Sequence, residues 1–146
     1  VIMVGYNFLN QSAATDVLPL SSKNGIGTMC MYAVRGGLAD HRRAGELIAE
    51  LSMRGEIDRA TYNADDPLGF LSENGRPIPI TEAAYRFCRH APGIEVVMTG
   101  TGSLEHLKQN IASIEAPPLP IAVAEQLRTI VGKVVSQSGN PLTVAG

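Results

Sequence analysis

Three short apolar segments separated by helical patterns constrain the fold of this chain more than any other feature. Residues 1–6, 26–33 and 94–98 are rich in Val, Ile and Met, so we predict three strands buried on both faces. Apolar periodicity predicts helices over residues 11–20, 41–56, 82–90, 104–114 and 122–135, followed by a tail at residues 138–141. Strands that alternate with helices indicate parallel βαβ units, and therefore an α/β fold.

The number of strands limits the architecture. The chain has 146 residues, which suits one domain spanning residues 1–146 without an internal boundary. A closed eight-stranded α/β barrel needs about 250 residues, and three strands cannot close a sheet. We therefore expect either part of a barrel or a small open sheet. Because the chain opens directly on a strand pattern at Val1, without an initiator Met, we expect a fragment or a processed chain.

Composition excludes several classes of function. The chain is 45% hydrophobic, 18% charged and carries a formal net charge of −2, so it has no basic field for nucleic acid or an anionic membrane. No apolar run reaches the roughly 18 residues of a membrane span, and no signal peptide is recognisable. Cys30 and Cys88 lie in apolar surroundings and are expected to be reduced core thiols. These features favour a cytoplasmic location.

Residues 94–110 have the pattern of a strand, a Gly/Thr loop and a helix. Gly100 and Gly102 allow a sharp turn and a close approach of a ligand to the backbone, and Ser103 suits the helix N-cap. The apolar stripe of the helix consists of Leu104, Leu107, Ile111 and Ile114. A helix start presents unpaired N–H groups and a partial positive charge, so this stretch favours a phosphate or nucleotide site.

A second glycine loop follows the second strand. In α/β folds ligands bind at the carboxyl ends of parallel strands, and residues 35–37 and 100–102 both lie at such ends. Two such loops could approach one diphosphate, although glycines of this kind often serve only to turn the chain. Arg35 either neutralises a phosphate or is a solvated loop residue, and His106 either contacts a nucleotide or lies on the surface. The Gly-x-Gly-x-x-Gly dinucleotide fingerprint is absent.

The remaining polar residues favour structural roles. Asp40 is expected to cap the helix over residues 41–56, in which Glu50 and Arg54 have the spacing of an ion pair. Residues 58–79 are rich in turn-forming residues and predict a long irregular segment. Asp65 and Asp66 lack a third ligand at useful spacing, so no metal site is expected.

Several motifs, spread over most of the chain, resemble the C-terminal half of the aldo-keto reductases. Residues 4–10, Val-Gly-Tyr-Asn-Phe-Leu-Asn, resemble the sixth barrel strand of that family, and residues 25–38 resemble its seventh strand and pyrophosphate loop. Residues 83–89 and 94–110 resemble its seventh helix, eighth strand and nucleotide-binding helix. The last stretch is the most specific, because Glu105, Leu107 and Asn110 fall at family positions.

The resemblance implies an NADP(H)-dependent reductase of aldehydes and ketones, built as a TIM (β/α)8 barrel that works without a metal. In that family a Tyr is the general acid, with Asp, Lys and His beside it, and all four come from the N-terminal half. This chain does not contain them, so it is expected to be inactive alone and to need the N-terminal half as a partner. The residues implied in cofactor binding are Met31, Tyr32, Val34, Gly36, Gly100, Thr101, His106, Gln109 and Asn110.

Each of these positions carries an implied role. Met31 stands where many relatives place an aromatic residue against the nicotinamide, and the next three residues of the set lie on the pyrophosphate loop. Gly100 and Thr101 lie where the 2′-phosphate or ribose of adenosine is held, with His106 in place of a frequent Arg. The last two residues of the set, at 109 and 110, lie where the adenine is held.

The chain departs from the family pattern at four places. Met31 cannot stack as a flat ring does, Met3 replaces a Gln that anchors the carboxamide, and Thr99 replaces a usual Pro. Gly100 and His106 offer less fixed positive charge than Lys and Arg at the 2′-phosphate. The resemblance favours NADP(H) over NAD(H), and these departures weaken that preference. A non-catalytic relative and an unrelated barrel for a phosphorylated ligand remain as alternatives.

Overall fold

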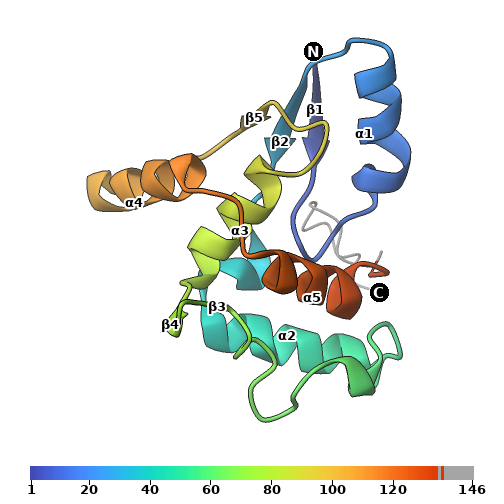
Figure 1. The fold of residues 1–146 in the computed structure, drawn as a ribbon, viewed down its shortest axis with the longest axis vertical. Coiled ribbons are helices and arrows are strands. Elements are labelled where there is room, and N and C mark those ends of the chain that lie inside the picture. The colour runs from blue at the N-terminus through green and yellow to red at the C-terminus, as the bar shows by residue number, and fades with distance from the viewer. Residues whose placement is uncertain (135, 137–146) are drawn as a thin grey trace.

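The computed structural model describes residues 1–134 and 136, and its centre is a parallel three-stranded sheet (Figure 1). The strands are β1 (Ile2–Gly5), β2 (Thr28–Met31) and β5 (Val96–Val97), in the order β1-β2-β5. All pairs are parallel, and Val4, Cys30 and Val97 lie side by side in register. The predicted α/β class and the parallel strands are confirmed, and within the described residues no further strand pairs with β1 or β5 at the edges of the sheet.

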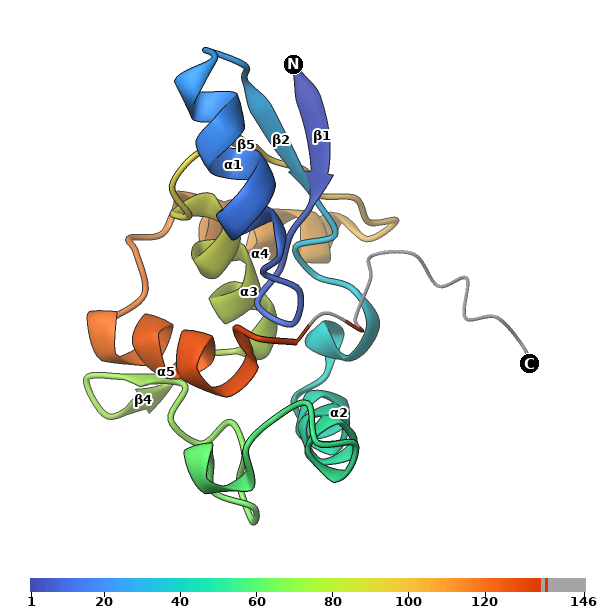
Figure 2. The same cartoon turned by 90° about the vertical axis from the view of Figure 1, so that its right-hand side faces the viewer.

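The described part of the chain also contains five α-helices. They are α1 (Ala13–Lys23), α2 (His41–Met53), α3 (Ile80–Arg89), α4 (Leu104–Glu115) and α5 (Ile121–Val131). Helix α1 lies alongside the strands, whereas α2 and α5 lie on the side toward which the strands point (Figures 1 and 2). Helix α4 packs against α3 and extends away from the body of the molecule (Figure 1).

The sheet is buried on one face only, so the prediction of strands buried on both faces was wrong. Val4 and Cys30 point to the face that the helices cover and are buried. On the opposite face Met3 is 53% exposed, and Val96 and Met98 are exposed as well. The described chain supplies no element that packs on this face. Its apolar residues match the interior of a barrel, of which three strands form only part.

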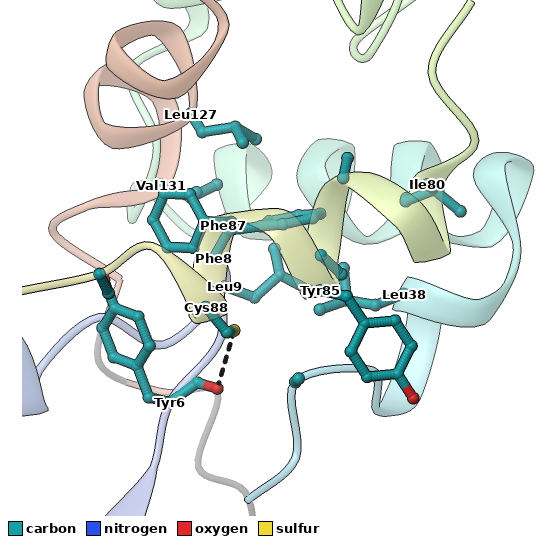
Figure 3. Close-up of a cluster of buried hydrophobic side chains, with 14 of the residues drawn as sticks. Tyr6, Phe8, Leu9, Leu38, Ile80, Tyr85, Phe87, Cys88, Leu127 and Val131 are labelled. Carbon is teal, nitrogen blue, oxygen red and sulfur yellow. Dashed lines mark hydrogen bonds between the residues drawn. The ribbon is translucent and has the colours of Figure 1, made fainter. Parts of the chain in front are cut away.

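The hydrophobic core lies between the helix-covered face of the sheet and α3 and α5 (Figure 3). The Phe87 ring stacks on Tyr6 with centroids 5.8 Å apart and meets Phe8 edge-on at 6.2 Å. The free thiols of Cys30 and Cys88 are both buried and donate to the Tyr6 carbonyl, at 3.2 and 3.4 Å. Burial raises the pKa of the Cys88 thiol. The expected place of both cysteines in the core is therefore confirmed.

The apolar stripe of α4 is the second place where burial was predicted wrongly. Leu104 is 70% exposed, Leu107 and Ile111 are exposed too, and only Ile114 packs against the core. The N-cap itself was predicted correctly, since the Ser103 hydroxyl accepts from His106 N at 3.3 Å. Helix α4 packs against α3, and within the described residues this packing leaves most of the stripe exposed.

Helix α2 ends earlier than predicted. Asp40 caps it as expected, accepting from Arg43 N at 2.7 Å. The helix stops at Met53, and Arg54 at the C-cap turns away to pair with Glu56 at 3.1 Å. Glu50 pairs with Arg43 instead, at 3.2 Å. The predicted pair between Glu50 and Arg54 is therefore not formed, because each side chain has another partner of opposite charge.

The segment over residues 58–79 is more regular than predicted. It contains a 3-10 turn, Arg59–Thr61, and an antiparallel hairpin of β3 (Ser72–Glu73) and β4 (Arg76–Pro77). Asn74 and Gly75 connect the two strands with φ values of 53° and 75°. Two consecutive positive φ values define a type I′ turn, for which Asn-Gly is a strong sequence signal. The hairpin was thus readable from the sequence.

Most of the other helix boundaries moved by one to four residues. Helix α1 begins and ends later than the predicted 11–20, and α3 begins at Ile80, two residues early. Helix α5 ends at Val131, whereas the prediction extended to Val135. Residue 135 and the predicted tail at 138–141 lie outside the described residues.

Arg86 joins three separate parts of the chain. Its side chain lies in α3, is only 2% exposed, and donates five hydrogen bonds. It reaches Glu73 in the hairpin at 3.0 Å and Glu82 in its own helix at 2.8 Å. It also donates to the carbonyls of Pro117 and Pro118 between α4 and α5, at 2.8 and 2.9 Å. All five guanidinium N–H groups therefore have acceptors, which is what a buried charge requires.

We predict that Arg86→Met destabilises the fold by about 3 kcal/mol, the lower end of the range for breaking one side of a buried ion pair, because both carboxylates are partly exposed. The matched control is Arg89→Met, since Arg89 lies in the same helix without an ion pair in the described residues. Urea unfolding measures both. Equal stabilities of the two variants would contradict the role of Arg86.

Candidate functional site

The carboxyl ends of the three strands meet at one edge of the sheet. Tyr6 N, just after β1, donates to Met31 O at the end of β2 at 3.2 Å. Met98 N, just after β5, donates to Cys30 O at 3.0 Å. The loops that follow the three strands are therefore neighbours in space. The two glycine loops predicted at residues 35–37 and 100–102 leave adjacent strands, as one shared ligand would require.

A hydrogen-bond network holds the base of the loop after β5. The Thr99 hydroxyl lies 2.8 Å from the hydroxyl of Tyr85 in α3 and accepts from Asn110 Nδ2 in α4 at 2.8 Å. Within the loop, Thr101 Oγ1 accepts from Ser103 N at 3.1 Å. The Thr99 hydroxyl therefore joins the loop to two helices, α3 and α4, by hydrogen bonds that a Pro at this position could not form.

The loop after β2 is organised around two side chains. Strand β2 ends at Met31, and the next residue, Tyr32, has a φ of 67°. The guanidinium of Arg35 lies 4.2 Å from the centroid of the Tyr32 ring, within the range of a cation–π interaction. Asn7, in the loop after β1, donates through Nδ2 to Tyr32 O at 3.0 Å. This contact joins the first loop directly to the second.

The predicted residues of the pyrophosphate region lie together at this edge. Met31 is partly buried on the uncovered face of the sheet, and Tyr32 follows it in the loop. Val34 is partly buried and packs against the core. Gly36 opens a 3-10 turn, Gly36–Ala39, and is exposed.

The predicted residues of the adenosine region lie on the other glycine loop and on α4. Gly100, Thr101 and His106 are exposed, and a Cβ added to Gly100 would meet nothing within 4 Å. Open space at Gly100 means that this glycine is not required by packing inside the chain. It therefore remains free to accommodate a ligand.

Gln109 and Asn110 point to different surroundings. Gln109 donates to Glu105 at 3.1 Å and lines a cleft of about 310 Å³ between the start of α3 and α4. Asn110 does not line this cleft, and its amide nitrogen donates a hydrogen bond to the Thr99 hydroxyl. Its carbonyl oxygen remains as the atom available to a ligand.

Sequence reasoning missed two residues of this site, Asn7 and Tyr85. In the sequence, Asn7 directly follows the first predicted strand and Tyr85 lies within a predicted helix, and neither position by itself indicates a role in the site. Asn directly after a buried strand is a weak signal for a side chain that orders neighbouring loops. Nothing in the sequence indicated that Tyr85 would reach Thr99, because that contact depends on how α3 packs against β5.

Two further observations bear on the kind of site. Among residues 1–134 and 136, no group of three or more His, Cys, Asp or Glu side chains could hold a metal ion. Asp66 instead lies 3.7 Å from His41 at the surface. Over the same residues, none of the helices has the length and apolar character to cross a membrane.

We predict that Thr99→Val destabilises the fold by about 1–3 kcal/mol, because it leaves the buried Tyr85 hydroxyl and the Asn110 amide without their partner. Thr101→Val is the matched control and should cost less, since Thr101 is exposed. Thermal unfolding of both variants checks this. The role of Thr99 is refuted if Thr99→Val and Thr101→Val unfold alike, or if adding Tyr85→Phe to Thr99→Val recovers no stability.

Comparison with known proteins adds the family context. The profile described as the aldo/keto reductase family matches residues 1–131. Among solved structures, the holo form of aldo-keto reductase AKR11C1 from Bacillus halodurans is similar, with a TM-score of 0.62 at 19% identity over 94% of this chain. The apo form of the same protein gives the same score and identity. A search of curated proteins found no match.

The match covers almost all of this chain but less than half of the matched structures. The chain covers 44% of the holo structure and 45% of the apo structure, so it spans less than half the length of these relatives. At this identity the likeness shows the fold, which is that of part of a barrel of parallel strands and helices.

Proposed function

Because the chain belongs to the aldo/keto reductase family, we propose that it forms the C-terminal, cofactor-binding half of an NAD(P)H-dependent carbonyl reductase. The observation that carries this proposal is the meeting of three strand ends at one edge within a chain that matches the family over residues 1–131. The substrate class is a small aldehyde or ketone. The catalytic Tyr, Asp, Lys and His would come from the N-terminal half.

The residues at the edge fit a dinucleotide. Arg35 offers a positive charge next to the exposed loop at Gly36, and a second exposed loop begins at Gly100 on the adjacent strand. The Ser103-capped start of α4 faces the same loop and favours an anion. When bound, a reduced nicotinamide dinucleotide supplies the hydride that a carbonyl carbon accepts. The side chains of this chain would bind and orient the dinucleotide.

The proposed assignment keeps the register of the family. Met31 would contact the nicotinamide, while Tyr32, Val34 and Gly36 would meet the pyrophosphate, the Val through its backbone. Gly100 and Thr101 would lie at the 2′ position.

His106 would lie beside that 2′ position, and Gln109 and Asn110 near adenine. The Asn110 carbonyl oxygen suits this place, because its amide nitrogen is already bonded to Thr99 and the oxygen can accept from an exocyclic amine.

We propose NADP(H) as the preferred cofactor, with NAD(H) as the alternative. The family register supports NADP(H), but the 2′ position has His106 and Gly100 where relatives have fixed cations. An exposed His is a weaker partner for a phosphate dianion than a guanidinium, which binds it in a bidentate manner.

The N-terminal half of the same barrel is the proposed partner. Exposed apolar side chains lie on the uncovered sheet face at Met3 and Met98, and on α4 at Leu104 and Ile111. Contiguous apolar surfaces of this kind normally mark an interface. Five further strands would cover this face and close both edges. We place the protein in the cytoplasm, without a nucleic-acid or membrane partner and without a metal.

A non-catalytic relative is the second candidate, favoured by Met31 and Met3 at positions where relatives contact the nicotinamide through a ring and a Gln. Such a protein would bind a dinucleotide without turning over a carbonyl. The presence of the catalytic Tyr and Lys in the other half decides between these two candidates.

We predict that the protein with its complete barrel binds NADPH, seen as a change in nicotinamide fluorescence on titration. His106→Arg should raise the affinity for NADPH about tenfold and leave that for NADH unchanged, because a charge-assisted hydrogen bond to the 2′-phosphate contributes about 1.5–3 kcal/mol. Absence of binding of both NADPH and NADH would refute the proposed function. An equal change in the affinities for NADPH and NADH would refute the placement of His106 beside the 2′-phosphate.

We predict that residues 1–146 expressed alone are inactive and associate or aggregate, because the open edges at β1 and β5 and the uncovered sheet face expose pairing groups and apolar surface. Sedimentation and thermal unfolding check this. Coexpression with the N-terminal half should restore a monomeric, cooperative unfolding transition. A sharp, reversible unfolding of the isolated chain as a monomer would contradict the prediction.

A further inference from the structure

Tyr32 has a backbone conformation that requires an explanation. Its φ of 67° lies in the left-handed region, which a residue with a bulky side chain adopts rarely and at an energetic cost. Such conformations persist only where surrounding contacts hold them, and they cluster at ligand sites. Tyr32 follows β2 at the edge where the candidate site lies.

Asn7 supplies the contact that holds this conformation. The Asn7 side chain is buried, and its Oδ1 accepts from Leu9 N at 2.9 Å and from Asn10 N at 3.0 Å. Because only an oxygen can accept both bonds, the amide nitrogen must point the other way, toward Tyr32 O at 3.0 Å. One side chain therefore fixes the loop after β1 and the carbonyl of Tyr32 together.

The left-handed backbone changes where the Tyr32 ring lies. In an extended strand, side chains alternate between faces, so residue 32 would follow Cys30 toward the helices. The ring instead lies over Gly5, since a Cβ added there would be 3.4 Å from Tyr32 Cδ2. Gly5 pairs with Met31 on the uncovered face. The ring is thus placed on the uncovered face, at its carboxyl edge, and is 39% exposed.

Arg35 is held by this ring. Its guanidinium lies 4.2 Å from the ring centroid, and it forms no ion pair within residues 1–134 and 136. Among the loops at residues 7–12, 32–40 and 99–103, Arg35 is the single Lys or Arg. The site edge therefore has one fixed positive charge on its loops. Stacking on the ring reduces the number of conformations that this charge would lose on binding a ligand.

We propose that Tyr32 and Arg35 form a diphosphate-binding element that Asn7 positions. Arg35 contacts the diphosphate, the Tyr32 ring supports the guanidinium, and Asn7 holds Tyr32 in the strained conformation that places the ring. This inference rests on the proposed dinucleotide site and names the cation that recognises the charged part of the ligand.

The test compares variants of the protein with its complete barrel, using ADP and NADH as probes in calorimetric titrations at low and high salt. Arg35→Met should weaken ADP and NADH binding about tenfold and reduce the salt dependence of ADP binding. Tyr32→Leu should weaken binding in the same direction but less, because the charge remains. Arg89→Met, which removes a charge at the C-terminal end of α3, should change the affinity for neither probe.

Asn7→Ala should weaken ADP and NADH binding about as much as Tyr32→Leu does. Urea unfolding of Asn7→Ala shows whether the loss of the contacts in the loop after β1 also lowers stability. Arg35→Met stays decisive because the Arg35 side chain makes no hydrogen bond within the described residues, so its replacement removes no internal bond. Wild-type affinity for ADP in Arg35→Met, or weaker binding with an unchanged salt dependence, would overturn this proposal while leaving the dinucleotide site intact. A wild-type protein that binds neither NADPH nor NADH would instead refute the proposed function and this element with it.

Discussion

The parallel pairing of β1, β2 and β5 is the constraint on which the candidate site depends. Parallel strands must be connected by helices, so all three carboxyl ends point to one edge and all three following loops begin there. Antiparallel neighbours would have sent every second loop to the opposite edge. The contacts between Asn7 and Tyr32, and between Thr99 and Asn110, exist because the chain has this arrangement.

The sheet is supported from one side and left open on the other. Arg86 and the buried aromatic cluster around Phe87 join α3, the hairpin and the segment before α5, so the helical layer is cohesive by itself. The opposite face has exposed Met and Val side chains, and in the described part of the chain both edge strands lack an outer partner. Pairing of the sheet edges with further strands is therefore favourable, because unpaired edges and exposed apolar surface are unfavourable in water.

Much of the fold could be predicted because it depends on local patterns. The strands, the five helices and the caps at Asp40 and Ser103 follow from periodicity and from side chains that satisfy a helix start. The hairpin was missed although Asn74 and Gly75 signalled it. Burial of the α4 stripe was predicted wrongly, since periodicity shows which face is apolar but not whether a neighbour covers it. In the site, the loops were found and Asn7 and Tyr85 were not.

Residue type and spacing along the chain were enough to predict the α/β class, the alternation of strands and helices, the two glycine loops and the family. Tertiary packing set which face of the sheet is covered and brought Thr99 into contact with Tyr85 and Asn110. It also decided that Tyr32 turns onto Gly5 beneath Arg35. The physical reason is that these contacts join residues up to 27 positions apart (Gly5 to Tyr32), and packing, rather than local preference, brings them together.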